Sequence, residues 1–221
     1  MIYSQPFVLN MIIDEHFTSY INSLEADRIP WLQQLREEAE SENVPIIRRE
    51  MEAFIRVLLQ LKKPENILEI GSGVGYSALF FKTVAADAHI TTIENYEPRI
   101  KAAEENFSKF SDGSIRLIQG DAVKIISEME GGFDFIFLDA AKAQYIVMLP
   151  DIIRLLNKDG ILLADNILQD GELIRSRYAL SRRQRTIHER MREFVYEVKH
   201  SDELSSSLLT VADGVILSVK L

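Results

Sequence analysis

The 221-residue chain is 47% hydrophobic and 27% charged, which gives it enough apolar material for one sizeable core. Its net charge of -9 argues against indiscriminate nucleic-acid binding over the whole surface but leaves room for a local basic patch. The lack of cysteine excludes disulfides, thiolate zinc sites and a cysteine nucleophile. We see neither a signal-peptide pattern nor an apolar run of membrane-spanning length, so we expect a cytoplasmic protein without a membrane partner.

Residues 1–62 are predicted to form a helical N-terminal extension. Apolar residues recur at spacings of three and four over residues 10–24 and 31–40, as they do on one face of an α-helix. A third helix is predicted from residue 44 onward and should end at Pro64, because proline cannot continue a helix.

The rest of the chain alternates between short apolar runs and helix-compatible segments. Such alternation predicts a parallel sheet with helices on both faces. The predicted strands cover residues 66–70, 89–94, 115–120, 133–139 and 160–165.

The end of the chain has a different pattern. Asp213 and Gly214 separate two β-rich runs, which predicts a hairpin and hence an antiparallel last strand. We find no internal repeat or linker, and we expect one domain over residues 1–221 with its α/β core at 65–221.

Three glycines follow the first predicted strand, where they would let the backbone approach a ligand closely. Gly71, Gly73 and Gly75 are spaced G-x-G-x-G, which differs from the dinucleotide-binding pattern and is also compatible with a simple tight turn. Glu94 ends the second strand about 20 residues further on, where an acid can accept both hydroxyls of an adenosyl ribose.

Two further acids flank this region. Asp121 and Ala122 follow the third strand, where an adenine edge would lie, and Glu69 precedes the glycines, where it could face a cationic ligand. A lone acid at a strand end is usually just solvated, but three at successive strand ends are harder to dismiss. This set resembles the class I S-adenosylmethionine-dependent methyltransferases over residues 65–221. The resemblance implies a Rossmann-like, seven-stranded sheet and S-adenosylmethionine (SAM) as cofactor.

Oxygen-bearing side chains also end the next two strands. Asp139 follows the fourth strand, and Asp165 with Asn166 follows the fifth. Because the carboxyl ends of parallel strands meet at one edge of a sheet, these side chains could converge there. An oxygen-only set suits Mg²⁺, with Ca²⁺ or Mn²⁺ as alternatives, better than zinc. The alternative is that Asp165 and Asn166 only cap the following turn.

The runs FIFLDAAKAQY and LLADNIL resemble the metal-dependent O-methyltransferases that include the catechol and caffeoyl-CoA enzymes. The resemblance implies that Asp139, Asp165 and Asn166 are metal ligands and that Lys142, beside Asp139, is catalytic. Lys142 would either accept the substrate proton or stabilise the oxyanion. The resemblance and the strand-end motifs together predict the residues that bind the cofactor. They are Ile47, Glu69, Gly71, Gly73, Ser77, Glu94, Asp121, Ala122 and Asp139.

The segment after the second metal motif is rich in arginine, which binds phosphate bidentately. It could equally be an exposed helix face with ion pairs between its own residues. The candidate RNA-binding residues are Arg175, Arg177, Arg182, Arg183 and Arg185.

Taken together, these motifs resemble the bacterial tRNA 5-hydroxyuridine methyltransferases most. That resemblance implies methylation of the wobble base to 5-methoxyuridine, the tRNA anticodon stem-loop as partner, and a homodimer. A catechol-like small molecule is the alternative substrate. A nicotinamide-dependent oxidoreductase is disfavoured by the glycine spacing, and a SAM-sensing module without catalysis would leave the metal motifs and Lys142 idle.

Overall fold

The computed structural model describes residues 15–25, 29–169, 171–176, 178 and 180–221. Three helices precede the sheet: α1 (Glu15–Ser23), α2 (Pro30–Ser41) and α3 (Arg49–Lys62). Residues 10–14 of the first predicted helix lie outside the described part of the chain.

The third predicted helix begins later than the apolar pattern indicated. α3 starts at Arg49, and residues 44–48 form a loop. Pro45 accounts for the non-helical backbone of Val44, because a proline disfavours helical backbone in the residue before it. The helix ends as predicted before Pro64, with Lys63 in the left-handed conformation at its C-terminus.

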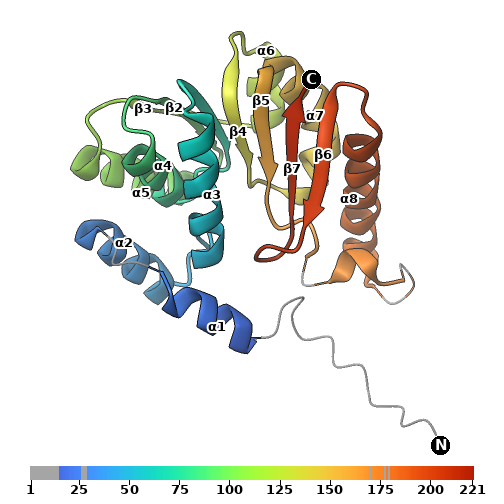
Figure 1. Ribbon diagram of the computed structural model, residues 1–221, viewed down its shortest axis with the longest axis horizontal. Helices are drawn as coiled ribbons and strands as arrows, with labels where there is room; N and C mark the ends of the chain where they lie inside the picture. The colour runs from blue at the N-terminus through green and yellow to red at the C-terminus, as the bar shows by residue number, and fades with distance from the viewer. Residues whose placement is uncertain (1–14, 26–28, 170, 177, 179) are drawn as a thin grey trace, which may run out of the picture.

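Seven strands form one sheet in the order β3-β2-β1-β4-β5-β7-β6. β1 to β5 are parallel, whereas β7 runs antiparallel to both β5 and β6, which confirms the predicted mixed sheet (Figure 1). The strands are β1 (Asn66–Ile70), β2 (His89–Glu94), β3 (Ile115–Gln119), β4 (Phe133–Leu138), β5 (Leu156–Ala164), β6 (Leu204–Leu209) and β7 (Val215–Lys220).

Helices cover both faces of the sheet, because strand side chains alternate between two apolar clusters. α3, α4 and α5 pack on one face with α2 outside them, and α6, α7 and α8 pack on the other. Among the described residues, every helix is too short or too polar to cross a bilayer. The remaining helices are α4 (Tyr76–Val84), α5 (Glu97–Phe110), α6 (Ala122–Glu128), α7 (Tyr145–Leu155) and α8 (Arg182–His200), with short 3₁₀ turns η1 (Lys142–Gln144) and η2 (Glu172–Ile174).

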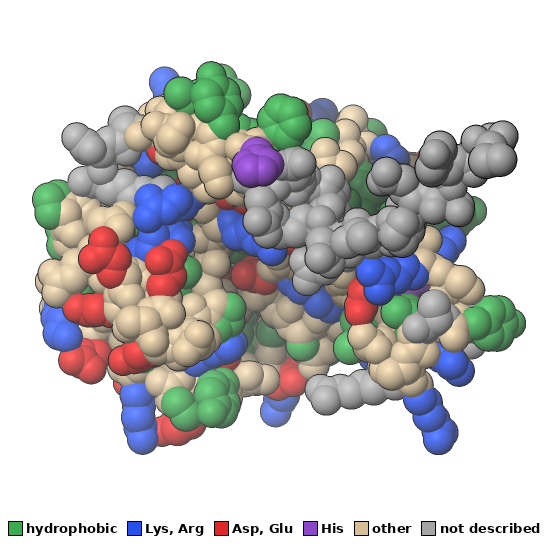
Figure 2. All heavy atoms as spheres, turned by 90° about the horizontal axis from the view of Figure 1, so that it is seen from below, with side chains coloured by type: hydrophobic (Ala, Val, Ile, Leu, Met, Phe, Trp, Pro, Cys, Tyr) green, Lys and Arg blue, Asp and Glu red, His purple; other side chains and the backbone are tan. Residues whose placement is uncertain are grey.

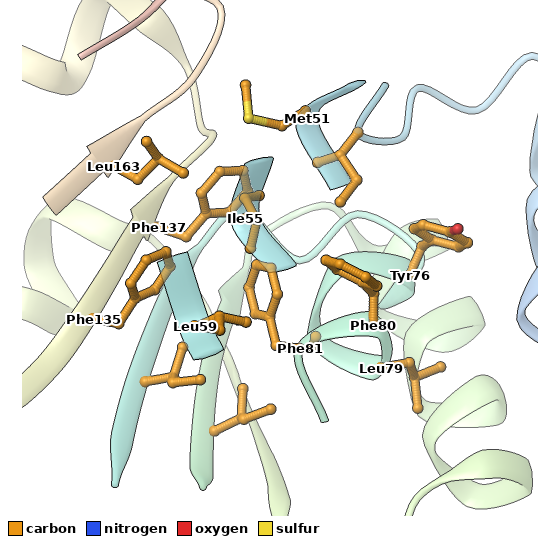
Figure 3. Close-up of a cluster of buried hydrophobic side chains, with 14 of the residues drawn as sticks. Met51, Ile55, Leu59, Tyr76, Leu79, Phe80, Phe81, Phe135, Phe137 and Leu163 are labelled. Carbon is orange, nitrogen blue, oxygen red and sulfur yellow. The ribbon is translucent and has the colours of Figure 1, made fainter. Parts of the chain in front are cut away.

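Aromatic side chains bind α4 to the middle of the sheet (Figure 3). Phe81 of α4 makes edge-to-face contacts with Phe135 and Phe137 of β4, at centroid distances of 6.2 and 5.5 Å. Ile55 and Met51 of α3 pack in the same cluster and are fully buried. The helices before the sheet therefore share the core of the α/β unit.

β1 and β4 lie side by side at the point where the strand order reverses, and Gly71 marks this junction. Its φ is +106°, and a Cβ there would lie 2.0 Å from the carbonyl oxygen of Asp139. The Asp139 N–H in turn donates to the Ile70 carbonyl at 3.0 Å. Only glycine permits this approach of the two strand ends.

Glu69, the residue before this junction, is a fully buried carboxyl group. It lies on the same face of β1 as Ile67 and accepts hydrogen bonds from the hydroxyls of Ser77 on α4 and Thr92 on β2. Burial raises the pKa of Glu69 to about 8, although both hydrogen bonds oppose the rise.

Gly71→Ala should destabilise the fold through both steric overlap and backbone strain. We expect the free energy of unfolding to fall by about 3 kcal/mol. Gly73→Ala is the matched control: φ there is +54°, but the nearest atom to an added Cβ is 4.0 Å away. It should cost about 1 kcal/mol. If urea denaturation shows the same loss of unfolding free energy in both variants, the close contact between Gly71 and Asp139 does not account for the destabilisation.

Glu69 should make stability decline with rising pH. Its pKa in the folded protein exceeds the ordinary 4.5. The contribution of Glu69 to stability is therefore fully present below pH about 4.5 and is lost as the pH rises through about 8. Glu69→Gln should flatten this part of the pH profile of the urea midpoint. Glu97→Gln, which changes an exposed acid, should leave the profile as in the unmodified protein. An unchanged profile in Glu69→Gln would contradict the assignment.

Candidate active site

A cavity of about 640 Å³ opens at the carboxyl ends of the parallel strands. It is lined by the glycine loop, by the ends of β2, β4 and β5, and by the loop that precedes α3. Figure 2 shows this face, with acidic and basic side chains around a central hollow. The volume is typical of a small-molecule or cofactor site, and ligands in open α/β sheets bind at this edge.

Most of the predicted cofactor residues line this cavity. Glu69 and Asp121 do not: Glu69 lies beneath it and bonds to Ser77, and Asp121 is exposed and caps α6 by accepting the Lys124 N–H at 3.1 Å. Both residues lie at predicted strand ends, but their side chains point away from the cavity. The lining residues from the predicted set are Ile47, Gly71, Gly73, Ser77, Glu94, Ala122 and Asp139.

Glu94 is held rigidly at the end of β2. One carboxylate oxygen accepts the Gly73 N–H at 2.9 Å, and the other accepts the N–H groups of Asn95 and Tyr96 at 2.9 and 3.0 Å. The oxygen bonded to Gly73 keeps a lone pair for a ligand. This carboxylate therefore joins the glycine loop to β2 and can accept a hydrogen bond from a hydroxyl group in the cavity.

Asp139, Asp165 and Asn166 converge as the strand order predicts. Hydrogen bonds between backbone groups place Asp165 beside β4, and the Asn166 amide lies 3.3 Å from a carboxylate oxygen of Asp139. Asn166 has a φ of 54°, a left-handed conformation that asparagine tolerates well. One Asp165 oxygen also accepts the Asn166 N–H at 2.6 Å, so the turn-capping interpretation holds for that oxygen.

Two acidic side chains lie close together in this group, with Lys142 as their neighbouring cation. Burial raises the pKa of Asp165 to about 7, and the neighbouring Asp139 adds to the rise while Lys142 opposes it. Within the described residues no three His, Asp or Glu side chains gather as a metal centre, so an ion here would need the Asn166 amide as well. Two carboxylates and an amide fit a hard divalent cation with open positions for other oxygens.

Lys142 lies in the same group of side chains. Its ammonium donates to Asp139 at 3.0 Å, to the Tyr145 hydroxyl at 2.8 Å and to the Asp165 carbonyl at 3.1 Å. Burial alone would lower the pKa of Lys142, but Tyr145 and Asp139 more than offset it and hold that pKa above its ordinary value. These hydrogen bonds favour the protonated form of Lys142.

Two residues that the sequence did not single out complete the site. Tyr145 is fully buried, and its hydroxyl accepts a hydrogen bond from Lys142. Its position three residues after Lys142 is the sequence feature that could have indicated this contact. Asp213 lines the cavity, and its carbonyl accepts the Leu168 N–H at 2.9 Å. The Asp-Gly pair was already explained by its preference for tight turns, so nothing in the sequence indicated that Asp213 also lines the cavity.

The arginine-rich segment follows the loop after β5 directly. Arg175 and Arg182 are exposed, whereas Arg185 is half-buried and donates to the Leu180 carbonyl at 3.0 Å. Arg177 lies outside the described residues, as does the side chain of Arg183. Of the five predicted arginines, the structure therefore shows two with exposed side chains, Arg175 and Arg182.

Comparison with known proteins identifies the family. The model of the O-methyltransferase family matches residues 22–221. The caffeoyl-CoA O-methyltransferase of Medicago sativa is 30% identical over 182 residues, which span 74% of this chain and 70% of the relative. The catechol O-methyltransferase of Niastella koreensis is 30% identical over 128 residues, which span 55% and 58%. Over the first three curated relatives the match spans 58% to 75% of their length.

The solved structures agree with this result. The SAH-bound methyltransferase PaMTH1 of Podospora anserina superposes with a TM-score of 0.84 at 26% identity, covering 100% of this chain and 98% of that one. The cavity at the switch between β1 and β4 therefore lies on a framework shared with SAM-dependent enzymes. The chain belongs to the O-methyltransferase family of the catechol and caffeoyl-CoA type, and it is a SAM-dependent O-methyltransferase.

Proposed function

We propose that this enzyme methylates 5-hydroxyuridine at the wobble position of tRNA, with SAM as methyl donor and Mg²⁺ as the metal. The proposal rests on the convergence of Asp139, Asp165 and Asn166 with Lys142 at the cavity. The exposed Arg175 and Arg182 follow this group in the chain. A 5-hydroxyuridine offers the 5-hydroxyl and the 4-carbonyl as two adjacent oxygens, which suits a cation with open positions.

The chain's own residues would divide the work as follows. Glu94 would accept a hydrogen bond from the ribose of SAM, and the glycine loop would let the cofactor approach the backbone. Mg²⁺ held by Asp139, Asp165 and Asn166 would supply positive charge that lowers the pKa of a substrate hydroxyl. Lys142, as an ammonium held by Asp139 and Tyr145, would stabilise the resulting oxyanion while the proton leaves to solvent.

The arginines support RNA as the substrate class. The protein carries a net charge of -9, so the exposed Arg175 and Arg182 are a local departure that would attract phosphate. Ser181 caps α8 and Gln184 bonds to Glu172 at 2.6 Å, which fixes the start of the helix against η2. The basic side chains would thus be presented from an ordered support close to the cavity.

A catechol-like small molecule is the second candidate. The relatives named after catechol and caffeoyl-CoA support it, since catechols also offer two adjacent oxygens. The two candidates share the metal site and Lys142, and they differ only in whether the arginines contribute to binding.

Asp165→Asn should remove most of the methyl transfer and its dependence on Mg²⁺. Loss of one ligand charge should lower kcat by about 100-fold or more, while SAH, the demethylated cofactor, still binds in calorimetry. Asp151→Asn, on α7 and paired with Arg154, is the matched control and should keep full activity. Full activity of the unmodified enzyme in excess chelator would refute the metal assignment.

Charge reversal at Arg175 and Arg182 should weaken tRNA binding selectively. Each lost phosphate contact should reduce the slope of log affinity against log salt by about 1. The control is Lys101→Glu with Lys109→Glu, exposed residues on the opposite face of the sheet. Turnover should be measured on tRNA that lacks 5-methoxyuridine and on a catechol panel. If the arginine variant loses catechol turnover but keeps tRNA turnover, the RNA proposal is wrong.

A further inference from the structure

A buried polar network joins three helices on one side of the cavity. Arg36 of α2, Glu52 of α3 and Tyr76 of α4 are 3%, 2% and 1% exposed. Arg36 forms an ion pair with Glu52, and its Nε donates to the Tyr76 hydroxyl at 3.2 Å. The Tyr76 hydroxyl also donates to Glu52, so the three side chains close a triangle of hydrogen bonds.

The same arginine holds the loop before α3. A guanidinium nitrogen of Arg36 donates to the Ile47 carbonyl at 2.7 Å. Residues 45–48 line the cavity, and so does Tyr76. Arg36 itself does not line it within the described structure. Arg36 therefore connects two separate parts of the cavity wall, the loop at Ile47 and Tyr76 of α4, without lining the cavity itself.

This loop also lies against the glycine loop. The Pro45 carbonyl is 4.0 Å from the position that a Cβ on Gly73 would occupy. Gly73 in turn donates to Glu94, the proposed ribose acceptor. Displacement of residues 45–48 would thus change the space directly above the glycine loop.

Stability alone does not account for such a network. Removing two charges from water costs several kcal/mol per ion, and well-packed apolar residues often replace a buried ion pair without loss of stability. What the apolar replacement would not provide is a donor for the Ile47 carbonyl, which is held at the wall of the cavity. The network's specific contribution is therefore the position of the loop.

We propose that Arg36 is a positioning residue for the cofactor: with Glu52 and Tyr76 it fixes residues 45–48 against the glycine loop and so preshapes the wall that SAM contacts. This inference rests on SAM binding in this cavity and is independent of the nature of the methyl acceptor. It gives the helices before the sheet a defined part in cofactor binding, since α2 supplies the arginine and α3 its carboxylate.

The test separates positioning from stability. Arg36→Met alone should lower the melting temperature, because it removes a cation that is paired with the buried Glu52 carboxylate. Arg36→Met combined with Glu52→Met should recover part of the melting temperature, because both charges are removed while the Tyr76 hydroxyl still loses these two partners. SAH affinity, measured by calorimetry without any acceptor substrate, should remain about tenfold weaker than that of the unmodified enzyme, as expected for loss of a charged hydrogen bond.

A matched control replaces another arginine that holds carbonyl groups. Arg154 pairs with Asp151 and donates to the carbonyls of Met129 and Ile126 at 2.9 and 2.7 Å. Arg154→Met with Asp151→Met should leave SAH affinity unchanged. Arg36→Lys keeps the charge but not the planar fork; it should fold and bind SAH more weakly, and it decides the question if the double variant fails to fold.

SAH affinity in the Arg36→Met, Glu52→Met variant equal to that of the unmodified enzyme would overturn the proposal, as would unchanged affinity in Arg36→Lys when the double variant is unfolded. Failure of the unmodified enzyme to bind SAH would instead contradict the cofactor assignment, and absence of turnover on tRNA would bear only on the proposed acceptor.

Discussion

The close approach of β1 and β4 at their carboxyl ends is the constraint on which the site depends. Gly71 lies so near the Asp139 carbonyl that no other residue fits, and the Asp139 N–H is bonded to Ile70. This junction sits where the strand order reverses, the place at which open α/β sheets bind ligands. The glycine loop and the first proposed metal ligand are therefore fixed relative to each other by backbone contacts, before any ligand binds.

A second set of backbone contacts fixes the other half of the site. The turn between β6 and β7 accepts the N–H groups of Ile167 and Leu168 at 2.9 Å each, so the antiparallel hairpin holds the loop that carries Asp165 and Asn166. Asp165 is thereby kept buried beside other acids, at a raised pKa. An unfavourable arrangement of this kind is common at functional sites, because a bound cation or substrate relieves it.

The sequence predicted the strand ends well because the signal there is local. A polar residue that closes an apolar run, such as Glu94, Asp139 or Asp165, is visible without knowledge of the fold. Side-chain direction is not local: Glu69 sits at a predicted strand end but turns toward α4. The Arg36 network joins side chains 16 and 40 residues apart, through contacts that no periodicity encodes. Such long-range polar pairs appear only once the helices are packed.

We propose that Asp139, Asp165 and Asn166 form one cation site at the carboxyl edge of the sheet. The most direct measurement is anomalous diffraction from crystals of the enzyme grown with SAH and Mn²⁺, an ion that can replace Mg²⁺ at oxygen sites. We expect a single anomalous peak in contact with all three side chains. A peak elsewhere, or no peak with the Lys142 ammonium still bonded to Asp139, would contradict it.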